Sequence, residues 1–134
     1  MEIIAALFVD NFALRQVEGP STRIDITGAY FSQVVAGPLP ATLSPHVVVL
    51  IFCPPGGAGQ GALEVVFRDA SHDDRPSIAR NVSPFTVEPG KFTYRLVRGE
   101  LEVSQYGRID AECRINDGPV VRIPLTLLAP PATN

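Results

Sequence analysis

The chain has 134 residues, of which 46% are hydrophobic and 19% charged; eleven basic and fourteen acidic residues give a formal net charge of −3. This length favours a single domain that buries about two-thirds of its unfolded surface, so it needs no disulfide or metal ion to form a core. The composition excludes an intrinsically disordered chain, and the negative charge argues against a nucleic-acid-binding domain, because such domains are usually basic.

The first apolar run, from Ile3 to Val9, predicts a strand. Glu2 stands where a secretory signal would carry a basic residue, and Asp10 ends the run after seven residues. Seven residues are also far fewer than the roughly 20 that span a bilayer. We therefore expect a cytoplasmic protein that does not associate with membranes.

Further strands are predicted along the chain from the alternation of apolar and polar residues. Residues 23–30 begin with charged residues alternating with isoleucines, and the run at 47–53 is apolar throughout, as in a strand covered on both faces. Three shorter alternating segments lie at 63–68, 92–96 and 101–104.

The clearest pattern is at residues 108–115, where apolar and charged residues alternate without error. Asp117-Gly118 follows and predicts a hairpin turn, with a return strand at 121–127. Pro124 lacks a backbone donor, so this return strand should lie at an edge or carry a bulge.

Together these segments predict an all-β fold with little or no helix, a single antiparallel β-sandwich of about seven to eight strands. The sandwich domain is expected at 1–129, followed by a short tail at 130–134 that begins with Pro130-Pro131.

Three stretches resemble a family of uncharacterised bacterial proteins of about 130 residues, a domain family of unknown function. They are a strand ending in an acidic residue (6–10), a short strand with a late glycine (24–29) and a closing hairpin (107–128). The resemblance implies an immunoglobulin-like or C2-like β-sandwich and a bacterial origin, with no assigned activity. Ala111 stands where the tyrosine corner of true immunoglobulin domains would place tyrosine, and the chain has no tryptophan.

Cys53 and Cys113 are the two cysteines. Without an export signal they are expected to be reduced thiols, although their separation of 60 residues leaves a disulfide between two sheets as an alternative. No CxxC spacing supports structural zinc.

Residues 26–63 contain no Asp, Glu, Lys or Arg. One interpretation is a central strand with neutral loops. The other is a surface buried against a second chain, because the centres of interfaces are depleted in charge. On the second interpretation the candidate interface residues lie in the apolar run: Val47, Val49, Ile51 and Phe52.

A polar cluster at 69–76 offers Asp69, His72, Asp73 and Asp74 as candidate metal ligands. Carboxylates on a loop suit calcium, but a calcium cage needs six to eight oxygens, so a second acidic loop would have to contribute. The alternative is a solvated turn whose Asp and Ser side chains bond to their own backbone.

No coherent catalytic set is visible. Ser71, His72 and Asp74 are too close in sequence to form a nucleophile–base–orienter line, and the glycine-rich segment 54–61 lacks the lysine of a phosphate-binding loop. The sequence thus predicts no enzyme and no cofactor. It favours a protein-binding or assembly module that associates with itself through 26–63; the second hypothesis is a calcium- or metal-dependent module using 69–74.

Overall fold

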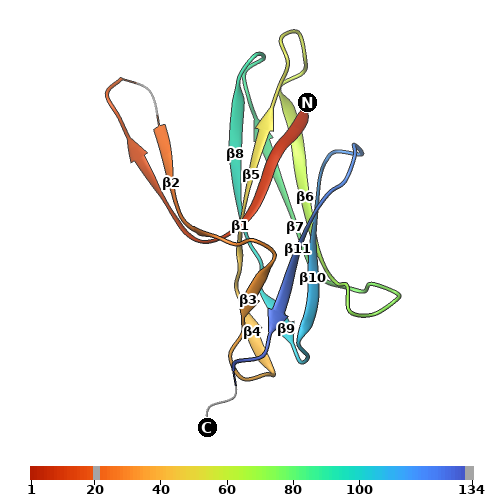
Figure 1. Cartoon of the computed structure of the whole chain (residues 1–134). Coiled ribbons are helices and arrows are strands. Elements are labelled where there is room, and N and C mark those ends of the chain that lie inside the picture. The colour runs from red at the N-terminus through yellow and green to blue at the C-terminus, as the bar shows by residue number, and fades with distance from the viewer. Residues whose placement is uncertain (20–21, 132–134) are drawn as a thin grey trace.

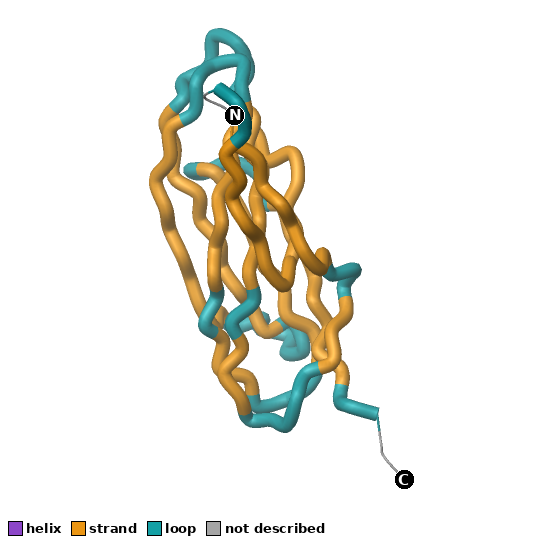
Figure 2. Tube along the Cα trace, turned by 90° about the vertical axis from the view of Figure 1, so that its left-hand side faces the viewer, coloured by secondary structure: helices purple, strands orange, loops and turns teal. Residues whose placement is uncertain are grey.

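The computed structural model describes residues 1–19 and 22–131, which form strands, turns and loops (Figures 1 and 2). These residues confirm the all-β prediction, but the predicted number of strands is wrong because β3, β4 and β7 had not been expected. In this described part the chain forms eleven strands: β1 (Glu2–Gln16), β2 (Thr22–Ala29), β3 (Gln33–Val35), β4 (Ala41–Leu43), β5 (His46–Phe52), β6 (Gln60–Asp69), β7 (Ser77–Thr86), β8 (Phe92–Arg98), β9 (Leu101–Val103), β10 (Gly107–Ile115) and β11 (Val121–Leu128).

The strands belong to three sheets as far as the described residues show. Sheet A has the order β2-β1-β5-β8, sheet B the order β3-β11-β10-β6-β7, and β4 and β9 form the small sheet C. The pairs are antiparallel except that β3 runs parallel to β11. The prediction of one wholly antiparallel sandwich is therefore corrected in both sheet number and strand direction.

The inner faces of sheets A and B share one hydrophobic core. Phe8 of β1 and Phe67 of β6 meet across it, with ring centroids 6.5 Å apart. The alternation predicted for 108–115 is confirmed, since the apolar residues of β10 are buried in this core. The arrangement is sandwich-like, with each large sheet presenting its other face outward.

The predicted closing hairpin is also confirmed, because β10 pairs with β11 from Gly107↔Leu127 to Cys113↔Val121. Pro124 lies opposite Asp110 of β10. On its other side β11 pairs with β3 at Thr126–Leu128, beyond the proline. The prediction that this strand lies at an edge or carries a bulge is wrong, because β11 lies between β3 and β10 and its pairing with β10 is regular. The proline is tolerated because no described strand pairs with that side of β11 at Pro124.

The charge-free segment does not form one face, because it runs from β2 through β3, β4 and β5 into β6 and so contributes to all three sheets. Val47, Val49 and Ile51 have 0% exposed surface within the single chain. A side chain without exposed surface cannot contact a partner, so the prediction that these three form an interface is wrong. Phe52 points the other way and is half-buried.

Both cysteines are free and buried, so the alternative of a disulfide between the sheets is wrong. Burial raises the pKa of the Cys113 thiol to about 12, which keeps it protonated and unreactive at neutral pH. Cys113 packs in the core as a small apolar residue.

Pro130 and Pro131 belong to no strand, and the rest of the predicted tail, 132–134, lies outside the described residues. Within 1–19 and 22–131, no helix has the length and hydropathy needed to cross a membrane.

Candidate protein-interaction surface

An arm projects from the sandwich, formed by the second half of β1 and by β2, and here defined as residues 10–16 and 22–29 (Figure 1). β1 is longer than predicted: its first half pairs with β5 and its second half pairs with β2. The arm bends out of the plane of sheet A, so that it lies in front of the outward face of β5 and β8 (Figure 2).

The base of the arm is fixed by Asp10, Gly28 and Tyr30. The Tyr30 hydroxyl donates to the Asp10 carboxylate, and the Tyr30 N–H donates to the Phe8 carbonyl at 2.8 Å. Burial, followed by the bond to Asp10, raises the pKa of Tyr30 to about 12, so the hydroxyl remains a donor. Gly28 has φ +68°, and its missing Cβ leaves the space that the Asp10 carboxylate occupies. The acidic residue and the glycine of the first two resemblance stretches thus meet at the bend.

One face of the arm is apolar and the other is polar. Phe12 pairs with Ile26 and Leu14 pairs with Ile24, which places these four side chains on one face. Leu14 is 52% exposed and Ile26 is 41% exposed. The opposite face includes an exposed ion pair between Arg15 Nε and Asp25 Oδ2 at 3.0 Å, along with Arg23 and Thr27.

A groove separates the apolar face of the arm from the outward face of sheet A. We call this the arm groove; its volume is about 450 Å3. At the base of the arm, the rings of Phe12 and His46 meet edge to face with centroids 5.7 Å apart. Phe92, on β8, is 63% exposed. The lining residues are Thr22, Ile24, Ile26, Leu50, Phe92, Thr93 and Tyr94.

β2 is the outermost strand of sheet A. Among the described residues it pairs with β1 alone, so its other edge presents unbonded N–H and C=O groups. A free edge next to an apolar groove is a place where another strand can add to a sheet.

A second distinctive surface is the outward face of sheet B, which is charged. At its centre, Asp110 is 1% exposed and accepts hydrogen bonds from Arg75 Nη2 at 2.8 Å and Arg108 Nε at 2.7 Å. The two arginine side chains remain 33% and 51% exposed. Guanidinium groups therefore cover the buried carboxylate.

Glu112 lies beside Asp110 on the same face of β10 and has a side chain 12% exposed. It accepts hydrogen bonds from Arg68 Nε at 2.6 Å, Arg122 Nη2 at 2.7 Å and Arg75 Nη2 at 3.0 Å. Burial alone would raise the pKa of Glu112, but these three arginines outweigh it and lower the pKa to about 2. Glu112 is thus ionised at every physiological pH.

The chain matches no model of a known protein family and no curated protein sequence. The two surfaces are therefore interpreted from their own chemistry.

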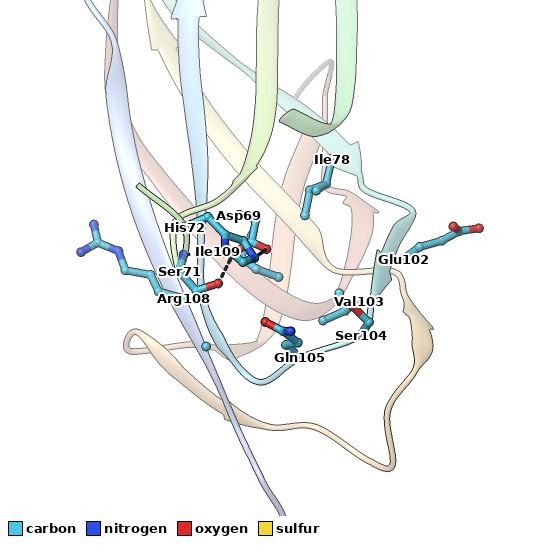
Figure 3. Close-up of a pocket in the computed structure, with 11 residues that line it drawn as sticks. Asp69, Ser71, His72, Ile78, Glu102, Val103, Ser104, Gln105, Arg108 and Ile109 are labelled. Atoms are coloured by element: carbon cyan, nitrogen blue, oxygen red, sulfur yellow. Dashed lines mark hydrogen bonds and ion pairs between the residues drawn. The ribbon is translucent and has the colours of Figure 1, made fainter. Parts of the chain in front are cut away.

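The predicted metal ligands are not brought together. Asp69 Oδ2 lies 3.5 Å from His72 Nε2, and Asp69 also accepts bonds from the Ser71 N–H, at 3.0 Å, and the Ser71 hydroxyl (Figure 3). Asp73 and Asp74 are exposed in the turn that follows. In the described chain no three His, Cys, Asp or Glu side chains are placed to hold a metal ion. The loop has the features of the solvated turn, with Asp69 bonding to the nearby backbone.

Neither surface is predicted by the sequence patterns described above. The signal for the arm is the alternation of Phe12 and Leu14 beyond Asp10, where the apolar run at 3–9 ends. The signal for the charged face is the alternation of charged residues at 108–114. Neither pattern shows which strand pairs with β1 or with β10. Each surface is created by that strand pairing.

Proposed function

We propose that the chain is a non-catalytic binding and assembly module that associates with a second copy of itself through the arm. The observation that carries this proposal is the apolar face of the arm, exposed at Leu14 and Ile26 over an apolar groove. A two-stranded ribbon is only marginally stable in water by itself, so an arm of this kind gains stability when its apolar face is covered.

The free edge of β2 is self-complementary, which favours a second copy as the partner. In an antiparallel pairing centred on Ile24, Arg23 stands opposite Asp25 of the second copy, and the two-fold axis repeats this charge pair. Ile24 then faces its own counterpart, and the apolar faces of the two arms become continuous. A single strand thus supplies both halves of the contact.

The proposed self-association is the one that the sequence favoured, but its contact lies on the arm and not on β5. Of the charge-free segment, Ile26 and the half-buried Leu50 line the arm groove. Val47, Val49 and Ile51, which the sequence favoured as interface residues, pack instead in the core between the two sheets.

No observation favours the second hypothesis, a calcium- or metal-dependent module, because Asp69 and His72 meet without Asp73 and Asp74. The immunoglobulin-like or C2-like class, the bacterial family and the cytoplasmic location stay proposals. The shared core of two facing sheets supports the first of these. The two free buried thiols suit a reducing compartment.

Two neighbouring substitutions on β2 test the proposed contact. Ile26→Lys places a charge on the apolar face, and Thr27→Lys places the same charge on the polar face of the same strand. In sedimentation velocity at tens of micromolar, we expect the unmodified chain and Thr27→Lys at twice the 14.4 kDa chain mass. Ile26→Lys should sediment as a monomer, because burying an unpaired charge weakens such a contact by about 2 kcal/mol, roughly thirtyfold.

A monomeric unmodified chain at about 100 μM would contradict self-association. Equal dimerisation of the two lysine variants would place the contact somewhere other than the apolar face of the arm.

A further inference from the structure

The outward face of sheet B carries more positive than negative charge, unlike the rest of the chain. Within the described residues, the outward face of sheet B gathers six arginines and three carboxylates: Arg68, Arg75, Arg80, Arg108, Arg114 and Arg122, with Glu64, Asp110 and Glu112. This face therefore has an excess of three positive charges on a chain whose net charge is −3. The rest of the sequence holds five basic and eleven acidic residues.

The carboxylates of this face lie underneath and the guanidinium groups lie on top. The side chains of Asp110, Glu112 and Glu64 are 2%, 12% and 17% exposed, whereas the six arginine side chains are 33% to 63% exposed. At the far end of the face Glu64 accepts from Arg80 Nε at 2.8 Å and from Arg114 Nε at 3.2 Å. A ligand approaching the strands of this face meets guanidinium groups first, and the exposed acids Asp73 and Asp74 lie beside it in the turn before Arg75.

The arginines are also held in place before any ligand arrives. Arg75 has φ +44°, a backbone conformation that is strained for a residue other than glycine, and its carbonyl accepts a bond from Arg68 Nη1 at 3.1 Å. Nη1 of Arg108 and of Arg122 donates no hydrogen bond to any described residue. Ordered guanidinium groups with free donors lose little side-chain entropy when they bind an anion.

The chemistry of the face distinguishes an acidic polypeptide from a nucleic acid. Proteins that bind single-stranded nucleic acid stack its bases on aromatic side chains. In the described strands of sheet B the aromatic residues are Phe67 and Phe85, and both are buried in the core. Guanidinium groups pair with carboxylates and with phosphates alike, so it is the lack of an exposed aromatic side chain on these described strands that favours an acidic polypeptide.

We propose that the outward face of sheet B binds an extended, acidic segment of another polypeptide. An extended segment repeats the side chains of one face about every 6.8 Å, the same repeat that separates alternate residues along β10. Its carboxylates accept from the free nitrogens of Arg108 and Arg122. The face lies opposite the arm groove across the sandwich, so the proposed dimer leaves it open.

Fluorescence anisotropy with a labelled peptide of about eight glutamates tests the proposal on the whole chain, at about 50 mM salt. Arg108→Gln combined with Arg122→Gln should weaken binding at least tenfold, because two positive charges and their free Nη1 donors are lost. The matched control, Lys91→Gln combined with Arg98→Gln, removes two exposed charges from β8 and its approach. It should change the affinity less than twofold.

A second variant guards against a loss of folding. Arg108→Lys combined with Arg122→Lys keeps both charges and loses the free Nη1 donors. It should fold, and it should bind the peptide several-fold more weakly than the unmodified chain. Ile26→Lys should bind the peptide as the unmodified chain does, which separates this proposal from self-association.

Three results would overturn the proposal. The first is no anisotropy change at about 1 mM peptide. The second is equal weakening by the glutamine pair and its β8 control. The third is tighter binding of a thymidine oligonucleotide with the same number of charges, which would indicate a nucleic-acid partner.

Discussion

Lowering the pH from about 5 to about 2 is expected to cost the protein about 3 kcal/mol of unfolding free energy through Glu112 alone. The pKa of Glu112 falls from its usual 4.5 to about 2 in the folded chain. Because the folded pKa is the lower one, this contribution is fully present above about pH 4.5 and is lost as the pH falls through 2. The side chain is 12% exposed, so solvent screens its arginine contacts only slightly.

The variant Glu112→Gln isolates this effect. At pH 7 its unfolding free energy, measured with urea, should be lower by about 3 kcal/mol than that of the unmodified chain. Its stability should also fall less steeply as the pH is lowered. Glu88→Gln is the matched control, since Glu88 also has an ion pair, with Lys91, but is 74% exposed. We expect no measurable change from the control. If Glu112→Gln shows the same acid dependence as the unmodified chain, the arginine network does not stabilise Glu112.

Gly28→Ala is expected to destabilise the fold by about 2 kcal/mol or more, measured by urea unfolding. Alanine at φ +68° is strained, which alone costs about 1 kcal/mol. Its Cβ would also displace the Asp10 carboxylate from the place where it accepts the Tyr30 hydroxyl. The bend at the base of the arm then loses both its backbone fit and its hydrogen bond.

Gly19→Ala separates strain from contact, because Gly19 has φ +83° and an added Cβ would meet no atom of the described residues within 4 Å. It should cost only the strain, about 1 kcal/mol.

In an Asp10→Ala background the extra cost of Gly28→Ala should disappear. Equal costs at the two glycines would mean that Asp10 does not fix the bend.

The parts of the fold that sequence predicted well are those where one strand face determines burial. The hairpin of β10 and β11 follows from unbroken alternation and the turn at Asp117-Gly118, and both strands appear as expected. β3 and β4 have three residues each, too few for a period to be recognised, and they exist because β11 and β9 lie alongside.

The errors at the site have a common physical reason. An apolar run such as 47–53 looks the same whether its partner is another sheet of the chain or another chain, and here it is sheet B. Acidic residues in a loop look the same whether they bind an ion or bond to their own backbone. The partner of each side chain depends on strand register, which composition does not contain.

The charged face shows the same limit. Alternation at 108–114 predicts that Asp110 and Glu112 point outward from their strand. Arg108 lies on the same strand, but the other arginines come from β6, β11 and the loop after β6, brought together by the pairings Asp110↔Arg68 and Glu112↔Arg122. An outward-facing acid is therefore buried by neighbours from distant parts of the sequence.

Hydrogen exchange of the β2 backbone amides (Thr22–Ala29), compared at about 1 and about 100 μM protein, tests self-association through the arm most directly. The account predicts slower exchange in β2 at the higher concentration, because its free edge pairs with a second copy. Exchange in β7 (Ser77–Thr86), the edge strand of sheet B, should not change. Identical β2 exchange at the two concentrations would contradict it.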